Sequence, residues 1–128
     1  MIKYLPHNKA TLTTPYVFYF YANGSRYKAT IPTNYKWDGA TGTYISGIIG
    51  FYKWGIHNNA VLEHDYLYTS NGTISIINTQ THKISTFSYD RKWADMHFKR
   101  KLLKHYAKWQ VSIIYHIIRM LGWLLRRF

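Results

Sequence analysis

An aromatic run near the N-terminus constrains the fold more than any other part of the sequence. Residues 16–21 read Tyr-Val-Phe-Tyr-Phe-Tyr, and Asn23-Gly24 follows them. Aromatic and β-branched residues favour strands, and Asn-Gly after such a run is typical of a tight hairpin turn. We therefore predict a strand over the run, a turn at Asn23-Gly24 and a return strand from Arg26 to Ile31.

The middle of the chain predicts a loop followed by a helix. Residues 32–50 contain four of the eight glycines, which indicates irregular backbone in a loop that can line a site. Asn58-Asn59 can cap a helix through residues 60–68, and Ser70-Asn71-Gly72 can end it.

The last third predicts a hairpin and two more helices. Residues 73–77 and 83–87 are rich in β-branched side chains and are expected to form a second, exposed hairpin. Asp90, or Ser88 before it, can cap a helix that reaches Tyr106. A further helix is expected from Gln110 to the C-terminus.

The order of these elements predicts an α+β fold, in which an N-terminal β hairpin and a glycine-rich loop pack on three helices. A small β wing is expected between the first two helices. A chain of 128 residues fits a single domain, with residues 1–50 mainly β and loop and residues 56–128 mainly helical apart from a hairpin near 73–87. The absence of cysteine excludes a disulfide scaffold, a zinc ribbon and a cysteine nucleophile.

The charge balance indicates negatively charged partners. Seventeen Lys and Arg stand against five Asp and Glu, a formal net charge of +12. Nucleic acid and an anionic lipid surface both fit this charge. The N-terminal residues lack the apolar run of a signal peptide, and the most apolar stretch, Val111–Leu125, is interrupted by His116 and Arg119. We expect neither a signal peptide nor a transmembrane span.

Few residues of this chain can supply a carboxylate for catalysis or metal binding. The five acids are Asp38, Glu63, Asp65, Asp90 and Asp95, and none of the 33 residues after Asp95 is acidic. On the first helix, His64 and Tyr68 share a face because they are four residues apart. Asp95 borders the apolar side of the second helix and needs a partner. That partner can be Lys99 or Arg91 on the same helix, or His64 across two helices.

Two motifs give the chain a family resemblance. His64-Asp65-Tyr66-Leu67-Tyr68 and Ala94-Asp95-Met96-His97-Phe98 resemble the HDxxY and ADxxF pair of the phospholipase A2 superfamily, closest to the cysteine-free domain of parvovirus minor capsid proteins. Asp38-Gly39-Ala40-Thr41, residues 60–68 and residues 91–98 also resemble a family of uncharacterised phage proteins with the pattern TDGAS, HDxxY and RxxAD. The second resemblance covers most of the chain from Ile31 onward, and that family has no settled activity.

The phospholipase resemblance implies a role for each matched residue. His64 would act as the general base that activates water against a lipid ester, Asp95 would orient and stabilise its imidazole, and Tyr68 would hydrogen-bond within the site. Asp65 would bind calcium together with the glycine-rich loop, where Asp38 and Gly39 are the candidate ligands. The implied function is a phage or viral enzyme that hydrolyses host membrane phospholipids, located in the virion or the host cytoplasm.

Other functions stay open from the sequence. Asp38, His64, Asp65 and Asp95 could instead hold a divalent metal for phosphodiester hydrolysis. The same cluster could be structural in a non-catalytic virion or host-interaction protein. Nucleic-acid binding is a further alternative, because aromatic and basic residues abound although no known binding motif is present. The other histidines, at 7, 57, 82, 97, 105 and 116, are assigned a surface or core role.

In the last helix Ser112, His116, Arg119 and Arg126 fall near one polar stripe, which we expect to face solvent while the wide apolar part packs on the core. Trp123, Arg126, Arg127 and Phe128 could also engage an anionic interface.

Overall fold

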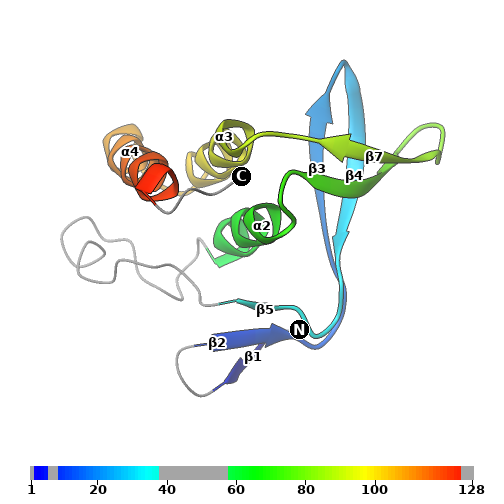
Figure 1. Cartoon of the computed structure of the whole chain (residues 1–128), viewed down its shortest axis with the longest axis horizontal. Coiled ribbons are helices and arrows are strands. Elements are labelled where there is room, and N and C mark those ends of the chain that lie inside the picture. The colour runs from blue at the N-terminus through cyan, green and yellow to red at the C-terminus, as the bar shows by residue number, and fades with distance from the viewer. Residues whose placement is uncertain (1, 6–8, 38–57, 125–128) are drawn as a thin grey trace.

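A computed structural model describes residues 2–5, 9–37 and 58–124 of the chain. The predicted α+β class is confirmed (Figure 1). Residues 38–50 of the predicted glycine-rich loop, including Asp38 and Gly39, lie outside the described residues. The elements are β1 (Ile2–Leu5), β2 (Lys9–Leu12), β3 (Tyr16–Ala22), β4 (Ser25–Ile31), β5 (Lys36–Trp37), α2 (Asn58–Thr69), β6 (Thr73–Asn78), β7 (Ile84–Ser88), α3 (Arg91–Leu102) and α4 (Lys108–Leu124).

The N-terminal hairpin forms as predicted. Strands β3 and β4 pair antiparallel along their whole length, from Tyr16 opposite Ile31 to Ala22 opposite Ser25. Asn23 and Gly24 both have positive φ, 51° and 77°, which is the geometry that a two-residue turn of this kind requires. Phe18 and Phe20 point into the core, and Val17, Tyr19 and Tyr21, which alternate with them, are exposed, as strand alternation dictates.

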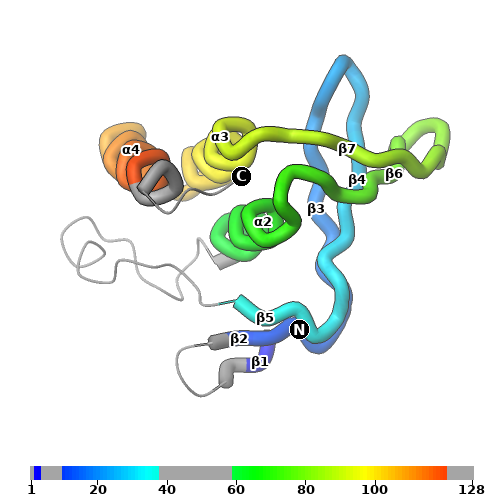
Figure 2. Tube along the Cα trace, in the orientation of Figure 1, coloured from blue at the N-terminus to red at the C-terminus, as the bar shows by residue number. Residues whose placement is uncertain are grey.

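The second hairpin forms between the first two predicted helices, as expected, but only part of it is exposed. Strands β6 and β7 join β3 and β4 in one antiparallel sheet of order β3-β4-β6-β7, with Tyr27 opposite Asn78 at the seam (Figure 2). Ile74 and Ile76 on β6 are buried, and burial of that face needs the hairpin to dock on the rest of the protein. Only β7, at the edge of the sheet, is largely exposed.

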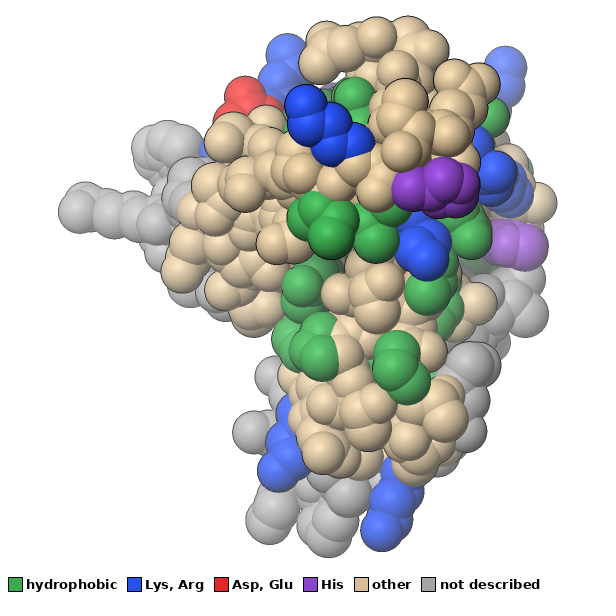
Figure 3. Space-filling view, turned by 90° about the vertical axis from the view of Figure 1, so that its right-hand side faces the viewer, with side chains coloured by type: hydrophobic (Ala, Val, Ile, Leu, Met, Phe, Trp, Pro, Cys, Tyr) green, Lys and Arg blue, Asp and Glu red, His purple; other side chains and the backbone are tan. Residues whose placement is uncertain are grey.

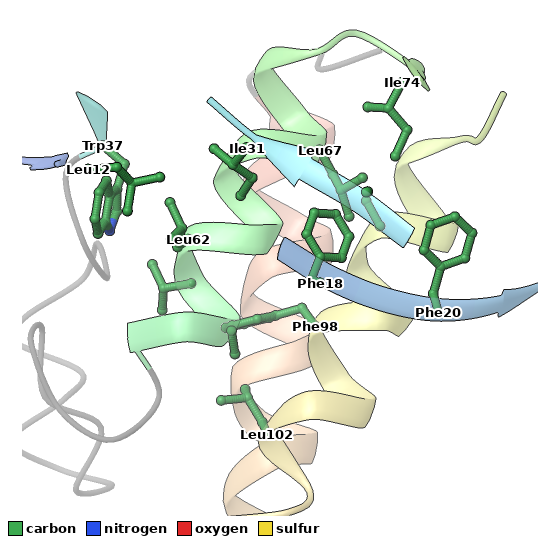
Figure 4. Close-up of a cluster of buried hydrophobic side chains, with 14 of the residues drawn as sticks. Leu12, Phe18, Phe20, Ile31, Trp37, Leu62, Leu67, Ile74, Phe98 and Leu102 are labelled. Atoms are coloured by element: carbon green, nitrogen blue, oxygen red, sulfur yellow. The ribbon is translucent and has the colours of Figure 1, made fainter. Parts of the chain in front are cut away.

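A second sheet consists of three short strands in the order β1-β2-β5. The sequence predicted β structure in this region but not these individual strands. Its seam joins Ala10 to Trp37, residues far apart in the sequence. Ala10, Leu12 and Trp37 are buried, so the sheet closes the core beside α2 (Figure 4).

The helix ends follow local chemistry. Helix α2 stops before Asn71 and Gly72, which both have positive φ, as predicted. Asp90 caps α3 by accepting a hydrogen bond from the amide of Trp93 at 2.7 Å. Helix α3 ends at Leu102 rather than at Tyr106, because the chain turns there to begin α4.

The helices form a layer in which α3 lies between α2 and α4, and the four-stranded sheet covers one side of it (Figure 1). Phe18 and Phe20 from β3, Leu62 and Leu67 from α2, and Phe98 from α3 point toward one another in this core (Figure 4). Among the described residues, no helix is both long and apolar enough to cross a bilayer.

Candidate functional site

Helix α2 directs consecutive polar residues toward different parts of the protein. Each residue turns about 100° around the axis, so Glu63, His64 and Asp65 face three directions. Glu63 points to β3 and α3, His64 points to α3, and Asp65 points to the segment before β5. Tyr68 lies one turn after His64, and the two rings contact each other with centroids 4.3 Å apart.

His64 and Asp95 meet across the interface between α2 and α3. The Nε2 atom of His64 lies 2.7 Å from Oδ1 of Asp95. A carboxylate can only accept, so Nε2 carries the proton and donates it, and Nδ1 is the unprotonated nitrogen of the neutral ring. In the described part of the chain Nδ1 has no hydrogen-bond partner, and the side chain keeps 14 % of its surface exposed. The structure therefore brings His64 and Asp95 together across two helices, one of the pairings that the sequence offered for Asp95.

Asp95 is fully buried and accepts hydrogen bonds from three side chains. Tyr68 donates its hydroxyl to Oδ1 at 2.5 Å, and Arg119 of α4 donates to Oδ2 at 3.0 Å. A buried carboxylate is tolerated when it is paired and hydrogen-bonded in this way. Neither Lys99 nor Arg91, the partners that the helical spacing offered, pairs with Asp95. Arg119 also turns inward instead of joining a polar stripe that faces solvent.

These contacts set the protonation state of the site. Burial by itself raises the pKa of Asp95, but the hydrogen bonds from His64 and Tyr68, with the contribution of Arg119, bring that pKa below its ordinary value of 3.8. Asp95 is therefore ionised at neutral pH. Burial and the neighbouring carboxylate raise the pKa of Tyr68, although the charges of Arg91 and Arg119 oppose the rise. Two arginines thus bring positive charge to the edge of the dyad.

Asp65 does not join the dyad. Its Oδ2 accepts a hydrogen bond from the hydroxyl of Tyr35 at 2.5 Å, and Tyr35 also bonds Thr69. Of the three candidate calcium ligands, Asp65 alone lies in the described residues, since Asp38 and Gly39 do not. Within residues 2–5, 9–37 and 58–124 no three His, Asp or Glu side chains are arranged to hold a metal ion. The described residues alone thus hold no such cluster, and the calcium centre and the four-ligand metal site, which both involve Asp38, stay predictions.

Sequence reasoning missed a second dyad beside the first. His97 of α3 lies with Nε2 2.7 Å from Oε1 of Glu63, which is fully buried. Oε2 of the same carboxylate accepts from Tyr16 at 2.6 Å and lies 3.3 Å from Nζ of Lys101. The sequence did contain a signal, because Glu63 lies one turn before the buried Leu67 on the same helical face. A carboxylate at such a position needs a buried donor.

The fold and site together define an α+β protein in which two His-carboxylate pairs join neighbouring helices. No protein-family model, curated protein or solved structure matches this chain. The resemblances to the phospholipase A2 superfamily and to the phage proteins stay predictions.

Proposed function

We propose that the protein is a phage or viral hydrolase that cleaves ester bonds of host membrane phospholipids, with His64 as its general base. The observation that carries this proposal is the orientation of His64, whose Nε2 donates to Asp95 while Nδ1 has no partner among the described residues. A neutral imidazole held in this tautomer is ready to accept a proton. The virion and the host cytoplasm are the locations we propose for it.

In the proposed reaction, the groups of the site act one after another. Nδ1 of His64 takes a proton from a water molecule as the water oxygen attacks the ester carbonyl. Asp95 stabilises the imidazolium that forms, and Tyr68 and Arg119 hold Asp95 in place. The imidazolium then returns its proton to the departing alcohol as the acyl bond breaks. The positive charge of Arg91 and Arg119 favours an anionic substrate such as a phospholipid.

Calcium is part of this proposal as an ion that would stabilise the oxyanion, held by Asp65 with Asp38 and the backbone of Gly39. The basic surface favours anionic lipid as the partner, and other virion proteins are the alternative partners.

The test is fatty-acid release from anionic phospholipid vesicles, with and without calcium. We expect His64→Ala to lower the rate at least 100-fold, which is the usual range for removal of a general base. The matched control is His116→Ala, an exposed histidine of α4 that lies outside the dyad, and it should keep the parent rate. Circular dichroism must show that both variants are folded. Equal release by parent and His64→Ala proteins would refute the proposal.

One observation favours a second candidate, a non-catalytic virion or host-interaction protein. The Glu63–His97 pair has the same 2.7 Å contact as His64–Asp95, and both of its side chains are buried. Such a pair can serve to hold two helices together, and the first pair could do the same. In that case His64→Ala would lower the free energy of unfolding, while no vesicle substrate would be hydrolysed by the parent protein.

A further inference from the structure

A groove of about 550 Å³ lies between strand β3 and helix α3. Five consecutive residues of β3, 17–21, form one wall, so the groove follows the free edge of this outer strand. His97, Arg100, Lys101 and Lys104 form the other wall. His97, Arg100 and Lys101 lie on the side of α3 opposite Asp95, and Lys104 follows the end of the helix, so the groove is distinct from the proposed hydrolytic site.

The groove is strongly positive. Arg26 of β4 completes its lining, and no carboxylate lines it. The neighbouring acid is Glu63, which is fully buried and already accepts from Tyr16 and His97 while it balances Lys101. In the part of the chain that the structure describes, Arg26, Arg100 and Lys104 form no salt bridge. The groove is therefore lined by three cationic side chains without a counter-charge: Arg26 on the outward face of the sheet, and Arg100 and Lys104 across the free edge of β3.

Aromatic rings stand beside these charges. Tyr19 and Tyr21 lie on the outward face of β3 and are 41 % and 73 % exposed. The guanidinium of Arg26 lies 4.2 Å from the ring centre of Tyr19, where it forms a cation–π contact. Figure 3, which shows the sheet-bearing side, has hydrophobic side chains, a class that includes tyrosine there, in its middle, with Lys and Arg around them and one small acidic patch at the upper left.

The base of the groove is held rigid by the second dyad. His97 borders the groove, and its Nε2 is fixed by Glu63. Trp93 stacks on the His97 ring at a centroid distance of 5.5 Å, and Phe18 packs against it. The Glu63 cluster thus links α2, α3 and β3, so the two walls keep their spacing.

We infer that this groove binds single-stranded nucleic acid, with Arg26, Arg100 and Lys104 on the phosphates and Tyr19 and Tyr21 stacked on bases. A channel that combines a line of cations with exposed rings is the arrangement that binds single strands without sequence preference. An acidic peptide would meet the charges but would leave the two tyrosine rings without stacking partners. A membrane surface is flat and would not enter a channel between a strand edge and a helix.

The test measures the Kd of a fluorescein-labelled 15-nucleotide oligothymidine by fluorescence anisotropy across a series of salt concentrations. The double variant Arg100→Gln, Lys104→Gln should bind at least tenfold more weakly and lower the slope of log K against log salt by about 1.4. The matched control is Lys83→Gln, Lys92→Gln, which removes the same charge from exposed positions outside the groove. This control variant should keep most of the affinity of the parent protein for the oligonucleotide.

A second pair of variants tests the rings. Tyr21→Ala should weaken binding about fivefold or more, whereas Tyr21→Phe keeps the ring and should keep the affinity. Both variants change an exposed side chain, so neither is expected to disturb the fold. No binding by the parent protein, or equal Kd values for the groove and control double variants, would overturn the inference. Equal displacement of the oligonucleotide by polyglutamate or phosphatidylglycerol vesicles at matched charge would also overturn it. None of these readouts depends on hydrolytic activity.

Discussion

At the scale of single residues, Tyr68 tests whether the dyad is held by its neighbours. Its hydroxyl donates to the same oxygen of Asp95 that accepts from His64. We predict that Tyr68→Phe lowers the free energy of unfolding by about 2 kcal/mol, because a hydrogen bond to a charged group contributes about 1.5–3 kcal/mol. The ring remains, so its packing on His64 is kept. Urea denaturation followed by circular dichroism measures the change.

The control for this prediction is Tyr27→Phe, at a half-buried tyrosine that packs on Phe20. Tyr27 donates to no carboxylate in the described residues, so its change should stay below about 0.5 kcal/mol. Equal losses of unfolding free energy at the two positions would contradict the view that the hydrogen bond from Tyr68 to Asp95 stabilises the folded protein.

The same residues show how far sequence can predict a site. The pairing of His64 with Asp95 was one of several alternatives, and a motif resemblance favoured it over the local partners Lys99 and Arg91. Arg119 could not be foreseen, because its contact depends on how α4 packs on α3. Glu63 and His97 were missed because no motif marked them, although their place on buried helical faces indicated a need for partners.

At the scale of elements, the start of α3 depends on one side chain. Asp90 accepts the amide of Trp93 and satisfies one of the free amides of the first turn. We predict that Asp90→Ala costs about 1 kcal/mol of the free energy of unfolding. Because Asp95 and His97 both lie on this helix, loss of the cap should also loosen their contacts with α2. Hydrogen exchange at the amides of residues 91–95 would report this.

The matched variant is Asp90→Asn, which removes the charge but keeps a good capping oxygen. It should retain nearly all of the stability of the parent protein. A loss as large as that of Asp90→Ala would mean that the charge, and not the cap, stabilises the helix.

Elements with local signals were predicted well, and those made by distant contacts were not. The turn at Asn23-Gly24 and the stop at Asn71-Gly72 are fixed by residues that accept positive φ. Strand β5 has only two residues, and it forms because Trp37 pairs with Ala10. No local sequence pattern predicts this distant pairing. The apolar periodicity through Tyr106 predicted a longer α3, but after Leu102 the amides of Lys104 and His105 bond to carbonyls three residues back, as in a turn. The next helix begins where Gln110 accepts the amide of Ala107.

At the scale of the whole molecule, three tyrosines join distant parts of the chain through buried or half-buried carboxylates. Tyr16 of β3 donates to Glu63, Tyr35 donates to Asp65, and Tyr68 donates to Asp95. Two of these bonds tie the N-terminal β region to α2, and the third ties α2 to α3. Asp65 and Asp95, which the sequence offered as site residues, are therefore also points at which parts of the fold are joined, as is Glu63.

This arrangement predicts that the fold weakens in alkali. Burial, together with each adjacent carboxylate, raises the pKa of Tyr16, Tyr35 and Tyr68 well above the ordinary value of 10.0. In the unfolded chain these tyrosines release protons near pH 10, while in the folded protein they keep them. The unfolded state is therefore favoured as pH rises above 10, and each tyrosine removes up to about 1.4 kcal/mol of stability per pH unit. Below pH 10 their stabilisation is fully present.

The measurement is the free energy of unfolding between pH 8 and pH 11, from urea denaturation. The comparison is between variants that differ only in tyrosines, so that every other effect of alkali is common to all of them. Replacing Tyr16, Tyr35 and Tyr68 together by Phe should lower stability at pH 8 but flatten its decline above pH 10. Replacing Tyr19, Tyr21 and Tyr27 by Phe instead should leave the decline as steep as in the parent, because none of them donates to a carboxylate in the described part of the chain. Equal slopes in all three proteins would show that the tyrosine–carboxylate bonds do not hold the layers together.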